Sequence, residues 1–164
     1  AGLLGYLPRL AHNPGVALMT PVVRVIEAFP PLLLGLLLMT LLGQGYWQEM
    51  VALTAALTPH MAVIFLLGDA DGRRRVFPAT ALMAALWLHA LGRAIILEAT
   101  LNFLDIGLLP LIPSWGGDLK ANLPYLHVNP AIVLFPGMAV VVSALGLTLM
   151  AQSVQQQTLK PQSL

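Results

Sequence analysis

Charged side chains are scarce in this sequence of 164 residues. It has 8 Lys or Arg and 7 Asp or Glu, which together make up 9% of the chain. A soluble domain carries about 25% charged residues, which cover its surface with groups that water solvates. The chain is instead 58% hydrophobic, with a mean hydropathy of +0.83. This composition favours an integral membrane protein over a soluble domain with an unusually apolar core.

Cysteine is absent, which excludes disulfides, thiolate metal sites and a cysteine nucleophile. The net charge of +1 indicates no polyanionic partner such as nucleic acid. No pair of histidines has the i, i+4 spacing of a helical metal site, and no glycine-rich loop has the pattern that cradles phosphates. The sequence therefore predicts no catalytic residues, no metal and no cofactor, and we expect a protein that is not an enzyme.

Long apolar stretches are the main feature that is present. A helix needs about 20 predominantly apolar residues to cross a bilayer. The stretches that meet this requirement are residues 22–43, 46–68, 76–104 and 131–152. We therefore predict an all-α fold, a polytopic transmembrane helix bundle with about four spanning helices in one domain, residues 1–164.

The start of the chain lacks an initiator Met and has no basic region before an apolar core, so it does not resemble a signal peptide. We expect either a fragment of a longer protein or an unusual gene start. For residues 1–20, which Pro8 and Pro14 interrupt, we expect a short surface segment.

The only charge cluster lies between the second and third stretches and reads Asp69-Ala-Asp-Gly-Arg-Arg-Arg75. Arginines retain a short loop on the cytoplasmic side of a membrane. With four spans, this loop and both chain ends share one side. The charge distribution therefore predicts a multi-pass membrane protein with both termini in the cytoplasm.

Three polar residues in the apolar stretches allow more than one interpretation. His60 follows Pro59, so it either hydrogen-bonds a carbonyl that the proline leaves free or is a functional intramembrane group. Arg93 and Glu98 lie about 25 to 33 Å along a helix from Val76, so they either reach the far interface or line the outer mouth of a pore. An ion pathway or intramembrane enzyme would have to use these residues.

An elbow runs from Glu98 to Gly117, between the third and fourth stretches. We expect the helix to break at Gly107 and the chain to turn through Pro110 and Pro113. A short helical turn from Trp115 to Leu123 is expected to lie along the membrane surface, where an amphipathic indole is favoured. The predicted topology places this elbow on the extracytoplasmic face.

The elbow also resembles a segment of the peptide/nickel-type ABC importer permeases. It reads Glu98-Ala-Thr-Leu-Asn-Phe-Leu-Asp-Ile-Gly107, and Ser114-Trp115-Gly116 follows after two prolines. The family's segment typically reads Glu-Ala-Ser-Leu-Ser-Phe-Leu-Gly-Leu-Gly, with prolines and Ser-Trp-Gly after it. Leu134-Phe135-Pro136-Gly137 before an apolar run is similar to the start of the family's final helix.

The resemblance implies a subunit in the cell inner (plasma) membrane, namely the second permease subunit of an importer for peptides or similar small solutes. Its implied partners are a second permease subunit, two ABC ATPase subunits and an extracytoplasmic solute-binding protein, within a lipid bilayer. The residues implied for the outer gate or elbow are Glu98, Asn102, Asp105, Gly107, Pro113, Ser114, Trp115 and Gly116. The residues implied for the cytoplasmic loop that faces the ATPases are Asp69, Asp71, Arg73, Arg74 and Arg75.

Two departures from the family lead to an alternative function. Members of the family usually have additional spanning helices before the part that this chain resembles. Its cytoplasmic loop also carries a coupling helix that docks into the ATPase, whereas residues 69–75 allow two helical turns at most and have no apolar face. The alternative is a degenerate, non-transporting membrane subunit that has lost its coupling to an ATPase.

Overall fold

The computed structural model describes residues 29–70 and 79–159. Over these residues the chain forms helices and turns without a strand, so the all-α prediction is confirmed. In chain order the elements are α3 (Pro31–Leu42), α4 (Tyr46–Ala70), α5 (Ala79–Phe103), α6 (Trp115–Asn122), the 3₁₀ helix η3 (Leu123–Tyr125) and α7 (Pro130–Leu159).

Helix α3 begins at Pro31, inside the predicted stretch 22–43, and ends at Leu42. Pro31 occupies its first turn, where a missing amide hydrogen costs nothing. Gly43 follows its last residue with a φ of 83°, and its amide donates to the carbonyl of Met39. At 12 residues the helix is about 18 Å long, shorter than the bilayer core. The part of the expected span before residue 29 lies outside the described residues.

Three helices are much longer, with 25 residues in α4, 25 in α5 and 30 in α7. Two segments among the described residues are long and apolar enough to cross a membrane, Met83–Phe103 in α5 and Pro130–Gln156 in α7. Helix α4 continues to Ala70, so Asp69 lies in its last turn, whereas the sequence predicted it in the following loop. That four segments span the membrane stays a prediction.

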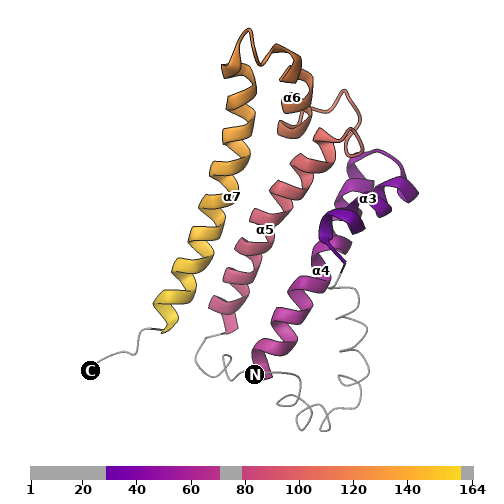
Figure 1. Cartoon of the computed structure of the whole chain (residues 1–164). Helices are drawn as coiled ribbons and strands as arrows, with labels where there is room; N and C mark the ends of the chain where they lie inside the picture. Colours follow the sequence, from indigo (N-terminus) through magenta and orange to yellow (C-terminus); the bar gives the residue numbers. More distant parts are fainter. Residues whose placement is uncertain (1–28, 71–78, 160–164) are drawn as a thin grey trace.

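The long helices α4, α5 and α7 lie side by side, with α5 in the middle (Figure 1). Helix α5 packs most extensively against α7, while α3 packs beside α4 and also contacts α5. The short helix α6 covers one end of the bundle, where it contacts both α5 and α7. The elbow residues therefore gather at the end of the bundle that α6 covers.

A small apolar core holds α3, α4 and α5 together at that end. Its buried residues are Met39, Ala52, Ala56, Leu57, Leu97 and Leu101. On the other side of α5, the buried Gly92 faces the backbone of α7 at Ala144, so small residues allow these two helices to approach closely.

Much of the outer surface of the long helices is apolar. Exposed large side chains include Trp87 on α5 and Phe135, Leu145 and Leu149 on α7. Contiguous apolar surface of this kind marks contact with lipid or with another protein. The fold therefore positions a polar elbow at one end of a bundle whose sides are apolar.

Candidate functional site

The elbow begins with a left-handed residue after α5. Asp105 has a φ of 66°, and the amides of Asp105 and Ile106 donate to the carbonyls of Asn102 and Leu101 at 3.0 and 3.1 Å. This pair of bonds is the Schellman arrangement that ends a helix. The helix therefore ends at Phe103, earlier than the break expected at Gly107, because Asp105 takes the left-handed conformation that usually falls to glycine.

Asn102 lies at the centre of the site and is 5% exposed. Its amide nitrogen donates to Oε1 of Glu49 at 2.8 Å, to Oε1 of Glu98 at 2.9 Å and to the carbonyl of Glu98 at 3.0 Å. Its amide oxygen accepts from the backbone amide of Leu108 at 2.6 Å. One side chain thus joins α4, α5 and the elbow.

Glu49 comes from α4 and is only 3% exposed. The sequence placed it next to Tyr46 and Trp47, which are exposed in the structure, and gave no sign that it turns inward. Glu98, one helical turn before Asn102, is half-buried and contacts the same amide. Glu98 therefore takes part in an internal contact that neither interpretation of this residue included.

The backbone of Gly107 lies directly against these polar side chains. A Cβ atom at this position would lie 2.6 Å from Oδ1 of Asn102 and 2.8 Å from Oε1 of Glu49. Real Cβ atoms essentially never come so close to an oxygen, so a larger residue would displace the cluster. Glycine is needed here because the elbow backbone passes directly over the side chains of Asn102 and Glu49.

Asp105 links the elbow to two further elements. Its carboxylate forms an ion pair with Lys120 of α6, with 2.7 Å between Oδ2 and Nζ, and both side chains are exposed to solvent. Its carbonyl accepts from the side-chain amide of Gln44, which precedes α4. An exposed ion pair contributes little to stability, about 0–1 kcal/mol, so the buried contacts of Asn102 dominate.

Ser114, Trp115 and Gly116 form the start of α6. Ser114 caps this helix, because its Oγ accepts from the amide of Gly117 at 3.0 Å. Gly116 is buried against α5, where a Cβ atom would lie 2.0 Å from the carbonyl oxygen of Ala99. Pro113 and Trp115 are exposed beside it. The short helix lies where the sequence predicts one.

The structure thus brings Glu98, Asn102, Asp105 and Gly107 together with Glu49, while the Ser114 end of the elbow lies above Ala99. Sequence reasoning missed Glu49 and Gln44. Both are far from the elbow along the chain, and only the packing of α4 against α5 brings them near.

Of the loop expected to face the ATPases, only Asp69 lies in the described part of the chain. Asp71, Arg73, Arg74 and Arg75 lie outside the described residues, and so does the side chain of His60. Arg93 is half-buried on α5. The role expected for this loop stays a prediction.

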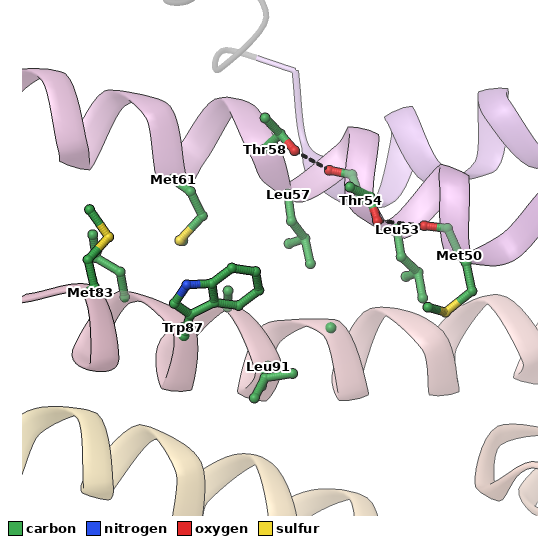
Figure 2. A pocket seen from close by; sticks show the side chains of 12 residues that line it. Met50, Leu53, Thr54, Leu57, Thr58, Met61, Met83, Trp87 and Leu91 are labelled. Atoms are coloured by element: carbon green, nitrogen blue, oxygen red, sulfur yellow. Dashed lines mark hydrogen bonds between the residues drawn. The ribbon is translucent and has the colours of Figure 1, made fainter. Parts of the chain in front are cut away.

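A second feature is an apolar groove between α4 and α5, with a volume of about 560 Å³. Figure 2 shows Leu57 and Met61 of α4 on one wall and Trp87 of α5 on the other. Thr54 and Thr58 also line it, but their hydroxyls donate to backbone carbonyls of their own helix. No lining residue carries a titratable group, so the groove suits an apolar occupant.

The polar groups of the elbow hold neighbouring segments of the chain in position through hydrogen bonds. Within residues 29–70 and 79–159, no three His, Cys, Asp or Glu side chains are grouped to hold a metal ion. The hydroxyl of Ser114 serves as a helix cap. The buried polar atoms of Asn102 are engaged with protein groups.

Comparison with known proteins identifies relatives over most of the chain. The peptide transport system permease protein SapC of Escherichia coli O6:H1 is 26% identical over 175 residues, which cover 94% of this chain and 59% of that protein. A peptide transport system permease protein of Brucella suis biovar 1 is 31% identical over 161 residues, covering 84% of this chain and 54% of the relative. A peptide ABC transporter permease protein of Sinorhizobium fredii is 25% identical, with 82% and 54% covered.

This chain spans 54 to 59% of the length of these relatives. No protein-family model matches it, and no solved structure does. The resemblance based on the elbow is nevertheless confirmed, because independent relatives align with most of the chain and have the same kind of name. Over most of its length, the chain is a homologue of the permease proteins of peptide ABC transport systems.

Proposed function

We propose that this chain is part of a permease subunit of an ABC importer for peptides or similar small solutes. It contributes helices to the translocation pore and performs no chemistry itself. The observation that carries this proposal is the alignment of 94% of the chain with a peptide transport system permease. The apolar outer faces of α5 and α7 support placement in a membrane.

The proposed location is the inner membrane, with both ends of this chain in the cytoplasm. Helices α4, α5 and α7, together with a span that includes α3, would cross the bilayer. The elbow and α6 then lie on the extracytoplasmic face, where the solute-binding protein docks. The segment from Asp69 to Arg75 faces the ATPases on the opposite side. The excess of arginine in that segment supports this orientation.

The proposed partners are a second permease subunit, two ABC ATPase subunits and an extracytoplasmic solute-binding protein. We expect a tagged form of the protein, co-expressed with its cognate permease and ATPases, to co-purify with them from a mild detergent. The control is the same preparation with the tag on an unrelated membrane protein. Purification of the tagged protein without its partners, while the other subunits still assemble, would contradict the proposal and favour the non-transporting alternative.

A further inference from the structure

Asn102 connects the end of α5 to the elbow that follows it and to Glu49 of α4, which lies 53 residues earlier in the chain. Its amide nitrogen reaches Glu49 on α4, and its amide oxygen holds the backbone of Leu108 in the elbow. Asn102 itself lies in the last turn of α5 and also contacts Glu98 one turn earlier. We call Glu49, Glu98, Asn102 and Leu108 the latch. The Glu49 arm of the latch holds α4, and the Leu108 arm holds the elbow.

Only an amide side chain can make this set of contacts. It offers two N–H donors and one carbonyl acceptor, while an ionised carboxylate offers acceptors alone. The two carboxylates of the latch require a donor, and the amide of Leu108 requires an acceptor. Glu49 and Asn102 are both at least 95% buried, so water cannot readily replace a broken contact.

Other contacts hold the same segments together. The side-chain amide of Gln44, just before α4, donates to the carbonyl of Asp105 in the elbow. Gly107 lies against both Asn102 and Glu49 with no room for a side chain. Ile106 packs on the apolar core that α3, α4 and α5 share. The elbow is therefore seated on α4 as well as on the helix from which it emerges.

We propose that Asn102 is a positioning residue that locks α4, the end of α5 and the elbow into one rigid unit. While the latch is closed, the elbow moves only together with α4 and α5. In the transporter, this unit would present the outer surface as a single body during each cycle, and this last step rests on the proposed function. The existence of the latch does not depend on it.

The test uses single reporter cysteines, which the cysteine-free chain allows. Ile106→Cys places a thiol in the half-buried part of the elbow, Leu111→Cys on its fully exposed part, and Ala144→Cys between α5 and α7. The rate of maleimide labelling is measured on the purified full chain in detergent. In the parent, we expect fast labelling at position 111 and slow labelling at positions 106 and 144.

The Asn102→Asp substitution retains the shape and the acceptor for Leu108 but removes the donor to both glutamates. We expect labelling at position 106 to rise about tenfold or more, which corresponds to about 1.4 kcal/mol of opening free energy, with no change at positions 111 and 144. The matched control is Asn122→Asp, because Asn122 donates only to the carbonyl of Asp118 within its own helix. It should leave all three rates unchanged.

A rescue separates a specific latch from general weakening. In the double variant Asn102→Asp with Glu49→Gln, the new glutamine amide donates to the new carboxylate, so the contact between α4 and α5 is restored with reversed roles, while the contact with Glu98 stays broken. We expect position 106 to become protected again. An unchanged rate at position 106 in Asn102→Asp, or no rescue in the double variant, would overturn the proposal.

If Asn102→Asp also exposes position 144, the milder Glu49→Ala variant decides, because it removes only the α4 arm. Selective exposure of position 106 in that variant supports the latch, while equal exposure of both positions refutes it. Labelling requires no transport. If the reporter cysteines show a closed latch but the assembled complex takes up no peptide, the proposed function is refuted. The latch proposal is not affected by that result.

Discussion

Gly116 lies where the first turn of α6 crosses the backbone of α5. A Cβ atom there would overlap the carbonyl oxygen of Ala99, at 2.0 Å. Backbone cannot move aside as a flexible side chain can, so a larger residue must lift α6 from the bundle. At the residue scale, the position of the elbow on the helix bundle depends on close backbone contacts as well as on the latch.

We therefore predict that Gly116→Ala destabilises the protein by about 1–3 kcal/mol, the usual cost of overpacking a tight contact. The measurement is the free energy of unfolding in mixed detergent and dodecyl sulfate micelles. The matched control is Gly146→Ala in α7, where a Cβ atom meets nothing within 4 Å. That variant should be unchanged or more stable by about 0.5–1 kcal/mol, because alanine favours a helix. Equal stability of Gly116→Ala and its parent would contradict the contact.

At the scale of elements, the groove between α4 and α5 is an apolar surface that is open within the described structure. Trp87 is 68% exposed there and lies about 12 Å along α5 from Ala79. A large aromatic ring in this place is expected to contact acyl chains when the chain alone is inserted in a bilayer.

The prediction is that Trp87 fluorescence is quenched by brominated lipid chains and not by aqueous iodide. The measurement uses a form with Trp87 as the single tryptophan, obtained by Trp47→Phe and Trp115→Phe. A form that keeps only Trp115, at the expected interface, is the control and should respond to iodide. Strong quenching of Trp87 by iodide would show that the groove faces water and would contradict the membrane placement of α5.

The helices could be predicted from sequence more fully than the site. Pro31 and Gly43 mark the ends of α3 through local backbone chemistry, and the serine before Trp115 marks the cap of α6. These signals act within a few residues. The long helices follow from apolar stretches of sufficient length, a property that requires no knowledge of their neighbours.

The latch could not be found in this way. Glu49 and Asn102 are 53 residues apart, and no local pattern connects them. Asp105, after the end of α5, takes a left-handed conformation that ends the helix, whereas the sequence predicted the break at Gly107. Both features depend on how α4, α5 and the elbow pack, so their physical causes lie in tertiary contacts.

At the scale of the whole molecule, orientation in the membrane connects the elbow to its proposed role. Leu111 is 96% exposed at the tip of the elbow, so a cysteine there would be reachable from whichever side it faces. We predict that Leu111→Cys reacts with an impermeant maleimide in intact spheroplasts. Arg74→Cys, in the arginine cluster, should react only after the membrane is opened. The reverse pattern would contradict the proposed topology.

ATP-dependent peptide uptake tests the proposed function most directly. The complete complex, with this chain, its partner permease and both ATPases, is reconstituted in vesicles with its solute-binding protein, and accumulation of a mixture of radiolabelled short peptides is measured. We expect accumulation that requires ATP and disappears when this chain is omitted. Accumulation that is the same without this chain, or none from an assembled complex that hydrolyses ATP, would contradict the proposed function.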